Sequence, residues 1–552
     1  MGMTRRHILW SLIPQGILLS LFTLVFSSCT ESRTPVEIAS AQGMLLLGNG
    51  SEPHGLDPHL TTGVPEHNIL HAIFEGLIAY HPTDESAPEP GVAESWEHNS
   101  DASVWTFHLR HDARWSNGDP VLASDFSYSI RRILSPALGA QYADQLIVLK
   151  GAEDFLKGNT TDFATVGVEV VDTHTLRLHL IGPTPHLPGM LKHNAWYPVN
   201  PRVIEAFGSI DSRESDWTRP ENLVGNGAFR ISRWVTNSYL EVLKSDTYWD
   251  ADRVRIKGIR FFPIEKASTE EAAFRAGQIH YCSNIPIDRI EFYRSKHPEV
   301  IRFDDYLGTY FYRFNTTRPP LDQPLVRRAL TLAIDTGLIV REVTRGGETP
   351  ARGFVYDGVS GYHTPGNIAF DPETARRLLA EAGFPEGSGF PKMDILINTQ
   401  EAHKMIAEAI QQMWRDHLGI DVGIVNQEWK VYLDNQVNLR YSISRSGWIG
   451  DYVDPITFLM IWTSDSGNNQ TGWSNHRYDE LYKQVLVTGD PGLRNALMGE
   501  MESIFLDELP VAPIYWYTRK YLLHPDVKNW HPKLLDYHPF KFIQLEPTGF
   551  RL

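Results

Sequence analysis

Residues 104–120 read VWTFHLRHDARWSNGDP, and this stretch carries the clearest local signals in the chain. Its first six residues alternate between apolar and polar side chains, which is typical of a half-buried β-strand. Residues 115–120 combine Asn, Gly, Asp and Pro, the residue types that favour a turn. The stretch therefore predicts a strand at 104–109 that is followed by a tight turn.

Strands and helices alternate along the chain on both sides of this stretch. The apolar run 44–47 ends in Gly48-Asn49-Gly50, which predicts a buried first strand closed by a turn. Apolar residues recur at helical spacing in 67–78 and 125–134, whereas 168–180 predicts a hairpin. Residues 32–42 are polar and without periodicity, so they read as a linker.

The C-terminal half continues the mixture of elements. A helix is predicted for 371–379, with Pro372 in its first turn and Gly383 beyond its end. Strands are predicted at 393–397 and 420–425, and a helix at 403–418 that stops at Gly419. This pattern predicts α/β or α+β lobes.

Length and composition limit the class of protein. The 552 residues exceed what a single hydrophobic core supports, so at least two lobes are expected. The 42% of hydrophobic residues and 21% of charged residues are typical of a folded chain. A net charge of −16 argues against a partner made of nucleic acid or an anionic membrane surface, since both attract basic proteins.

The N-terminus reads as an export signal. Arg5 and Arg6 precede a mostly apolar stretch that reaches Phe26, and Ser27 and Ser28 then lead to Cys29. This order resembles the signal of a bacterial lipoprotein, in which cleavage before the cysteine exposes a thiol for lipid attachment. We expect residues 1–28 to be a signal peptide and 29–42 a lipidated linker; an uncleaved membrane helix is the alternative. Lipidation of Cys29 would leave Cys282 as a single thiol without a disulfide partner.

Several motifs in the same order resemble the oligopeptide-binding proteins of bacterial ABC importers, the family-5 extracellular solute-binding proteins. They begin near Gly48 and extend to the C-terminus. The motifs are Gly91-Val92-Ala93-Glu94-Ser95-Trp96, Val104-Trp105-Thr106-Phe107-His108-Leu109-Arg110, Trp115-Ser116-Asn117-Gly118-Asp119-Pro120, Asn315-Thr316-Thr317-Arg318-Pro319-Pro320, Arg327-Arg328-Ala329-Leu330, Asn426-Gln427-Glu428-Trp429-Lys430 and Gly447-Trp448-Ile449-Gly450-Asp451-Tyr452.

The resemblance implies an α/β fold, a two-lobed periplasmic-binding-protein clamp of type II-like form with an additional third domain. Peptide would be enclosed between the lobes. The expected boundaries place domain I at 43–64, 191–307 and 519–552, domain II at 65–190, and the ligand-clamping domain III at 308–518. Gly308 and Ile449 stand where some relatives hold a disulfide, so that crosslink is absent.

The resemblance also implies which residues meet the ends of a peptide. In the family, the α-ammonium is met by the Asp of a Gly-Trp-x-x-Asp-Tyr motif, which is Asp451 here, beside the aromatic wall of Trp448. Arg445 matches an Arg that receives the peptide C-terminus, and His403 matches a His that serves peptides of another length. A buried ammonium without a counter-charge would be costly, which is the physical reason for such a carboxylate.

Other positions match segments of the family that contact the ligand. Gly63 and Val64 correspond to a backbone segment that pairs with the peptide. The remaining matches are the aromatic Tyr142 and Tyr517 and the polar Ser283 and Asn284, which lie just after Cys282.

Competing chemistry has less support in the residues. His67 and His71 have the i, i+4 spacing of a helical metal pair, but no third ligand is near in sequence. The acidic pairs Asp84-Glu85 and Asp304-Asp305 would need a defined spatial separation to act as a glycosidase. No Gly-x-Ser-x-Gly or His-Glu-x-x-His motif is present. We expect no catalytic residue, metal or cofactor, and an exported hydrolase is the weaker alternative.

The sequence thus predicts a lipid-anchored, extracytoplasmic substrate-binding protein. It would capture oligopeptides as a monomer and deliver them to a membrane permease driven by separate ATPase subunits. A binding protein or sensor for another ligand on the same fold, such as cell-wall peptides, remains an alternative. The preferred peptide length is not expected to be readable, because such proteins contact the peptide backbone and leave side chains in hydrated pockets.

Overall fold

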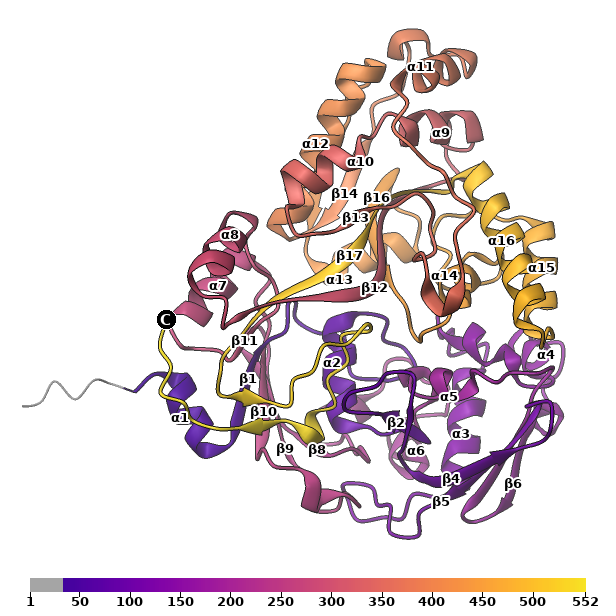
Figure 1. Cartoon of the computed structure of the whole chain (residues 1–552). Helices are drawn as coiled ribbons and strands as arrows, with labels where there is room; N and C mark the ends of the chain where they lie inside the picture. The colour runs from indigo at the N-terminus through magenta and orange to yellow at the C-terminus, as the bar shows by residue number, and fades with distance from the viewer. Residues whose placement is uncertain (1–32) are drawn as a thin grey trace, which may run out of the picture.

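The computed structural model describes residues 33–552. Two lobes lie one above the other and are joined by two long strands, β12 (Ile301–Phe314) and β17 (Val511–Leu523) (Figure 1). The chain mixes helices with large sheets, as the expected α/β clamp requires. The expected signal peptide and Cys29 lie outside the described residues. Within residues 33–552, no helix is both long enough and apolar enough to cross a bilayer.

An eleven-stranded sheet extends through both lobes. Ten of its strands follow one another in space, and the eleventh, β13 (Thr349–Pro350), pairs only with β17. The other strands, in spatial order, are β15 (Gly423–Gln427), β14 (Asp394–Asn398), β16 (Ile443–Ile449), β12, β17, β11 (Tyr281–Cys282), β1 (Met44–Gly48), β10 (Gly258–Phe262), β9 (Tyr239–Lys244) and β8 (Phe229–Val235). Strands β14 and β16 belong to the second lobe, and β1, β8, β9 and β10 belong to the first (Figure 1). Strand β15 pairs with β14 and so lies in the second lobe as well.

Smaller sheets complete the first lobe. A four-stranded sheet has the order β4 (Ala93–His98), β5 (Val104–Leu109), β7 (Thr175–His179) and β6 (Val168–Asp172). Two pairs remain, β2 (Ile78–Tyr80) with β3 (Pro88–Pro90) and β18 (Val527–Lys528) with β19 (Gln544–Leu545). The strand predicted at 104–109 is β5, and its alternation buries Trp105, Phe107 and Leu109 on one face.

The helices cover the faces of these sheets. The first lobe carries α1 (Pro35–Gln42), α2 (Val64–Ile73), α3 (Ala123–Ile133), α4 (Ala152–Leu156), α5 (Leu187–Met190), α6 (Pro201–Phe207), α7 (Ala267–Arg275) and α8 (Ile287–Lys296). The second lobe carries α9 (Pro324–Leu332), α10 (Thr336–Leu338), α11 (Pro372–Glu381), α12 (Glu401–Leu418), α13 (Trp429–Val437), α14 (Ile456–Leu459), α15 (His476–Leu486) and α16 (Pro491–Glu508).

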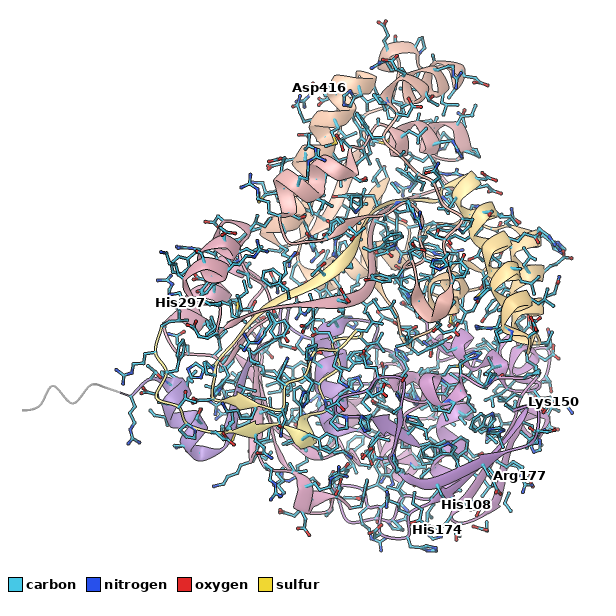
Figure 2. All side chains as sticks on the ribbon, in the orientation of Figure 1. His108, Lys150, His174, Arg177, His297 and Asp416 are labelled. Carbon is cyan, nitrogen blue, oxygen red and sulfur yellow. The ribbon has the colours of Figure 1, made fainter. Side chains whose placement is uncertain are left out.

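Helix α12 shows how the sequence determines one of these elements. Its buried residues recur every three or four positions, and Trp414 is fully enclosed against the sheet and α9. Trp414 Nε1 donates to the carbonyl of Leu330, 2.8 Å away. The helix ends at Gly419, whose φ of +67° is the left-handed conformation that glycine adopts without strain. In Figure 2, Asp416 near this end and Arg177 on β7 mark opposite ends of the molecule.

Most sequence predictions of local structure are confirmed. The first strand, the hairpin 168–180, the helix after Asp371 and the helix ending at Gly419 are present, and the helix predicted at 125–134 is α3. Three predictions are wrong in detail. Residues 35–42 form α1 rather than a linker, because Thr34 and Glu37 cap the helix reciprocally. Helix α2 occupies 64–73 rather than 67–78, and β15 begins at 423 rather than 420.

The domain boundaries remain predictions. The boundaries at 307/308 and 518/519 fall inside β12 and β17, which cross between the lobes without interruption. A strand that belongs to two lobes has no turn or linker to mark the border, so sequence patterns carry no signal there.

Candidate functional site

The two lobes enclose a cavity of about 820 Å³. This volume lies within the range of pockets that bind small molecules. All ten residues that the sequence analysis assigned to ligand binding line the cavity. They are Gly63, Val64, Tyr142, Ser283, Asn284, His403, Arg445, Trp448, Asp451 and Tyr517. Folding therefore brings together positions that are far apart in the chain.

An unpaired strand edge forms part of the wall. Strand β16 pairs with β12 along its whole length, but it pairs with β14 only at Ile443 and Ser444. From Arg445 to Ile449, the second edge of the strand has no strand partner. The carbonyl of Arg445 accepts hydrogen bonds from the Tyr432 hydroxyl and from Gln436 Nε2, so it points away from β12. Because backbone groups alternate in direction along an antiparallel strand, those of Gly447 and Ile449 face the same free edge.

Asp451 lies two residues beyond this edge and is 4% exposed. Its Oδ2 accepts from Gln145 Nε2 at 2.9 Å, and its backbone N–H donates to Thr457 Oγ1 at 2.9 Å. Burial raises the pKa of Asp451 well above its usual range, and repulsion from Asp144 acts in the same direction. No Lys or Arg of residues 33–552 forms an ion pair with this carboxylate. The site therefore favours a ligand that brings a cation.

Aromatic rings surround Asp451. The indole of Trp448 donates to the carbonyl of Thr457 at 2.8 Å, and its ring centroid is 6.2 Å from that of Tyr142. His193 Nε2 lies 3.4 Å from Asp451 Oδ1. Burial lowers the pKa of His193 well below its usual range, so this imidazole is neutral at pH 7 and does not supply the missing positive charge.

Arg445 provides the opposite charge at the other end of the free edge. Its guanidinium donates from Nη1 to Asn398 Oδ1 at 3.2 Å and from Nη2 to the Tyr517 hydroxyl at 3.0 Å. It also stacks over the ring of Tyr310, 4.7 Å from the centroid. Its Nε is buried without a hydrogen-bond partner, and within residues 33–552 its guanidinium donates to the neutral Asn398 and Tyr517 rather than to a carboxylate. A partly buried guanidinium in this state favours an anionic ligand group.

His403 lies beside Arg445 in the first turn of α12. Its Nδ1 is 3.3 Å from the hydroxyl of Tyr310. Burial lowers the pKa of His403 well below its usual range, and the neighbouring Arg445 lowers it further. The imidazole is therefore neutral, and it can contribute a hydrogen bond rather than a charge to a ligand.

Gly63 and Val64 begin α2 on the opposite wall. A Cβ at Gly63 would lie 2.1 Å from Glu66 Oε2 and 3.2 Å from a ring carbon of Trp429, which belongs to the second lobe. Glycine at this position therefore leaves room mainly for the Glu66 carboxylate of the same helix, and Trp429 narrows the space further from the second lobe. The Val64 side chain is 43% exposed, in keeping with a position next to the cavity.

Ser283 and Asn284 form the wall between these ends. Both follow β11 directly, and their backbone N–H groups donate to the buried carboxylate of Glu270. Asn284 Oδ1 accepts from Gln400 Nε2 of the second lobe at 3.0 Å. The thiol of Cys282 is buried and lies 3.2 Å from the carbonyl of Asn284. Gly308 and Ile449 face each other directly in the β12–β16 register, as the expected crosslink position requires.

Sequence reasoning missed several residues of this wall. Arg313 Nε donates to Ser446 Oγ at 3.2 Å and its Nη1 to the carbonyl of Asn468 at 3.0 Å, and burial lowers its pKa. As the single charged residue in the apolar run 307–314, it could have been suspected from the sequence. His193 and Tyr537 also line the cavity, but they lie in segments with no recognisable motif.

The histidines and acidic residues considered above as metal ligands or catalytic groups have hydrogen-bond partners within the protein. His67 Nε2 contacts His71 Nε2, and His67 Nδ1 lies 2.7 Å from Asn194 Oδ1. Burial lowers the pKa of His67 to about 4. Asp304 accepts from the Tyr521 hydroxyl, and Glu85 accepts from the backbone of residues 534 and 535. Within residues 33–552, no group of three or more His, Cys, Asp or Glu side chains is arranged for a metal ion.

Comparison with known proteins places this architecture in a family. The model of the bacterial extracellular solute-binding proteins, family 5, matches residues 87–470. The periplasmic oligopeptide-binding protein OppA of Salmonella typhimurium is 34% identical over 539 residues, covering 95% of this chain and 96% of the relative. The periplasmic murein peptide-binding protein MppA of Escherichia coli is 34% identical over 489 residues, covering 87% and 88%.

Solved structures agree in fold and also distinguish two conformations. The complex of Haemophilus influenzae OppA with the peptide RPPGFSPFR superimposes with a TM-score of 0.87 at 33% identity, covering 91% of this chain and 99% of that one. The unliganded open form of MppA gives a TM-score of only 0.61 at 32% identity, covering 91% and 97%. The lobes of this protein are therefore arranged as in a closed form. The chain belongs to the family-5 bacterial extracellular solute-binding proteins.

Proposed function

We propose that this protein captures oligopeptides outside the cytoplasm by closing its two lobes around them. The observation that carries the proposal is the free edge of β16, with an unpaired carboxylate beyond one end and an unpaired guanidinium at the other. A peptide is an extended chain with one cationic and one anionic end, so it matches both the hydrogen-bonding edge and the two charges.

Each part of the site has a role in this mechanism. The peptide adds as a strand along Gly447 and Ile449, which satisfies its backbone groups regardless of its side chains. Its ammonium meets Asp451, and its carboxylate meets Arg445, with His403 supplying a neutral hydrogen bond. Trp448, Tyr142 and Tyr517 wall the strand, and the opposite lobe contributes Gly63 and Ser283. Because ligand contacts come from both lobes, binding shifts the population from open to closed forms.

Relatives support the ligand class. OppA proteins of four bacteria in the comparison carry the name oligopeptide-binding, and two solved relatives contain a bound peptide. Such proteins serve importers, so we propose delivery to an ABC permease with separate ATPase subunits. The role is that of a monomeric binding protein rather than an enzyme. Incubation with peptides checks this point: stoichiometric retention without cleavage is expected, and turnover would indicate an exported hydrolase.

Cell-wall peptides are the second candidate ligand. The identity of 34% with a murein peptide-binding protein equals that with OppA, which favours neither class. Murein peptides also carry a free ammonium and carboxylate. Mass spectrometry of the material released when the purified protein is denatured distinguishes the two, because murein peptides contain residues that ordinary peptides lack. Release of neither class would contradict the proposal.

Attachment to the membrane rests on Cys29, which lies outside the described residues. The proposal is that signal cleavage leaves this cysteine as the lipidated N-terminus on the periplasmic or extracellular face. Cys29→Ser should then move the protein from the detergent phase to the aqueous phase in a partitioning experiment. Unchanged membrane retention of the variant would instead indicate an uncleaved helix.

A further inference from the structure

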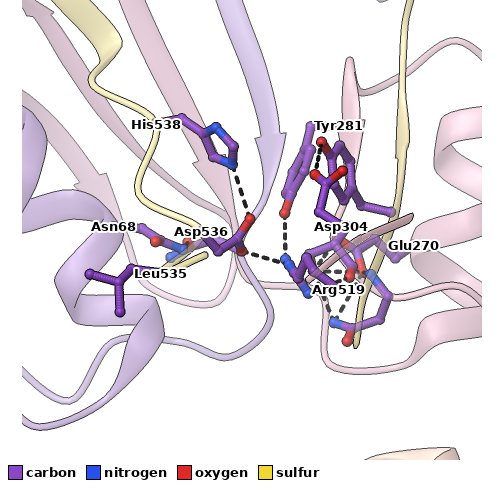
Figure 3. Close-up of polar contacts among 12 residues, drawn as sticks. Asn68, Glu270, Tyr281, Asp304, Arg519, Leu535, Asp536 and His538 are labelled. Carbon is purple, nitrogen blue, oxygen red and sulfur yellow. Dashed lines mark hydrogen bonds and ion pairs between the residues drawn. The ribbon is translucent and has the colours of Figure 1, made fainter. Parts of the chain in front are cut away.

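Glu270 lies directly behind the cavity wall, in the first turn of α7, and is completely buried. Its Oε1 accepts from the N–H and the hydroxyl of Ser283, both at 2.8 Å, and its Oε2 accepts from the N–H of Asn284 at 3.0 Å. One carboxylate thus fixes the backbone of two consecutive residues that line the cavity. Figure 3 shows Glu270 beside Arg519 and Tyr281.

The position of this carboxylate is itself fixed by close packing. A Cβ at Gly48, the last residue of β1, would lie 1.8 Å from Glu270 Oε1. Glycine at that position leaves the space that the carboxylate fills. Because the end of β1 blocks one side and the 283–284 segment the other, Glu270 cannot relax away from its partners without moving the wall.

The same segment reaches the opposite lobe. Asn284 Oδ1 accepts from Gln400 Nε2 at 3.0 Å, and Gln400 precedes the first turn of α12, which carries His403. A parallel contact joins Ser268, in the same turn as Glu270, to Glu401, with the Ser268 N–H donating to Glu401 Oε2 at 3.2 Å. The turn of α7 that holds Glu270 therefore meets the N-terminus of α12 across the closed lobes.

We propose that Glu270 is a positioning residue for ligand capture. It holds the 283–284 segment in the place where the segment lines the cavity and contacts the N-terminus of α12 in the closed form. It also makes ligand capture dependent on pH near neutrality. The proposal rests on the proposed function and adds a regulation to it. Ligand meets Ser283 and Asn284, while Glu270 acts through them.

The pH dependence follows from the surroundings of the carboxylate. Burial raises the pKa of Glu270 to about 7, although its bonds to Ser283 and Asn284 and the charge of Arg519 favour the ionised form. The other titratable groups that face it, Tyr281 and Cys282, remain neutral because burial raises the pKa of each well above its usual range. The charge of Arg519 is shared with Asp536, 2.5 Å away (Figure 3).

The sign of the effect differs between binding and folding. The ionised carboxylate accepts all the donors of the segment, so affinity for ligand should fall as pH drops through about 7. The folded-state pKa is raised above 4.5, so the contribution of this group to folding stability is present at low pH and is lost as pH rises through about 7. A merely structural carboxylate would not move affinity and stability in opposite directions.

Calorimetric titration with alanine tri-, tetra- and pentapeptides at pH 6 and pH 8 tests this. For wild type, loss of one hydrogen bond to a charged group predicts a decrease in affinity of about tenfold at pH 6. E270Q should bind more weakly at pH 8 and show a correspondingly smaller pH ratio. E271Q is the matched control, because Glu271 is equally buried in the same helix but bonds to Tyr293 and Arg275. It should keep the wild-type ratio.

A double-mutant cycle tests the route through α12. If Glu270 acts through Asn284 and Gln400, the losses of affinity in E270Q and Q400A should be non-additive. Additive losses together with a wild-type pH ratio in E270Q would overturn the proposal. If E270Q does not fold, S283A provides the test, because it removes one donor to the Glu270 carboxylate. The proposal requires that S283A change the ratio of the affinities at pH 8 and pH 6.

A measurement without ligand separates this inference from peptide binding itself. The bonds of Glu270 to 283–284 lie within one lobe, so hydrogen exchange of that segment in the ligand-free protein should rise in E270Q and not in E271Q. Unchanged exchange would overturn the positioning role even if peptides bind. Absence of peptide binding by wild type at pH 8, with increased exchange in E270Q, would instead count against the proposed function alone.

Discussion

At the scale of single residues, the clearest sign of a binding site is a buried carboxyl and a half-buried guanidinium that both lack an ion-pair partner of fixed charge. A buried Asp or Arg in a folded protein normally has a partner of opposite charge. Asp57 and Arg132 illustrate the ordinary case, since their side chains form an ion pair in the first lobe. Asp451 and Arg445 lack such partners, so the folded protein retains two sites at which a ligand can complete an ion pair.

The first prediction concerns Asp451. Asp451→Ala leaves a bound ammonium buried without a counter-charge, which should cost about 3–5 kcal/mol, or roughly a hundredfold to several thousandfold in affinity. Asp451→Asn should also weaken binding, because the amide keeps the shape without the charge. N-acetylated peptides lack the ammonium and should bind wild type poorly, with a smaller further loss in the variants. Equal calorimetric affinity of wild type for free and acetylated peptides would disprove the role of Asp451.

The second prediction concerns the pH dependence of stability through Asp144. Its Oδ2 accepts from the Ser466 hydroxyl of the opposite lobe, while its Oδ1 is buried without a partner. Burial raises the pKa of Asp144 to about 7. A raised pKa means that the stability contributed by this group is present at low pH and lost as pH rises through about 7.

The measurement for Asp144 is the melting temperature at pH 5.5 and pH 8. Wild type should lose more stability over this interval than Asp144→Asn, by about 1–3 kcal/mol, the cost of an unsatisfied buried polar group. Asp112→Asn provides the control, since that side chain is exposed. An identical decrease in wild type and Asp144→Asn would contradict the assignment.

At the scale of elements, a strand whose pairing stops halfway creates the ligand edge. Exposed edges are usually blocked, because an unpaired row of N–H and C=O groups attracts other chains. Here the edge of β16 faces the cavity rather than bulk solvent, which restricts access to a chain that enters between the lobes. The parallel β14 leaves the strand after Ser444, so the free stretch begins where Arg445 presents its guanidinium.

The third prediction concerns Gly447 on this edge. A Cβ here would lie 2.5 Å from the Tyr517 hydroxyl, which also accepts from Arg445. Gly447→Val should therefore displace Tyr517 and Arg445 and obstruct the edge, with a loss of affinity of at least about tenfold, equivalent to 1.4 kcal/mol. Calorimetry with alanine peptides is the test, and wild-type affinity in this variant would exclude strand addition at β16.

The fourth prediction concerns Gly499, a glycine that does not line the cavity and serves as a comparison for Gly447. Gly499 lies inside α16, and a Cβ there meets no atom within 4 Å outside its own helix. Gly499→Ala should stabilise the protein by about 0.5–1 kcal/mol, because alanine loses less backbone entropy in a helix. Denaturant unfolding measures the gain, and peptide affinity should not change. A destabilised Gly499→Ala protein would mean that the helix does not tolerate the methyl group.

At the scale of the whole molecule, closure depends on contacts that only the assembled lobes provide. Lys157 of the first lobe pairs with Asp465 of the second at 2.8 Å, and Gln145 donates to Asp451. Exposed pairs such as the first contribute little, so closure without ligand should be marginal. Ligand bridging both lobes would then determine the balance between open and closed forms.

The fifth prediction concerns this balance in solution. The closed, ligand-bound protein should have a radius of gyration near the compact value of about 24 Å for a chain of this length. The ligand-free protein should be measurably larger, because a fraction of molecules is open. Small-angle scattering with and without peptide provides the comparison. Identical scattering curves, with binding established by calorimetry, would show that capture does not require closure.

Local sequence patterns were enough to predict most of the helices and strands and the family. Strand β5, the hairpin 168–180 and the glycine-ended helix α12 were predictable because alternation, turn residues and capping act over a few positions. The ten residues assigned to the ligand were identified from motifs, and all of them line one cavity. The variants described above test the individual roles of Asp451 and of the strand edge at Gly447.

The way in which these residues act depends on contacts between segments that are far apart in the chain. The half-paired edge of β16, the unpaired state of Arg445 and the neutral His403 depend on neighbours from distant parts of the chain. The role proposed for Glu270 could not be predicted from the sequence, because its partners Ser283 and Asn284 come close to it only through the packing of α7 against β11. Burial and pairing are properties of the whole fold, and they determine charge and hydrogen-bonding capacity at the site.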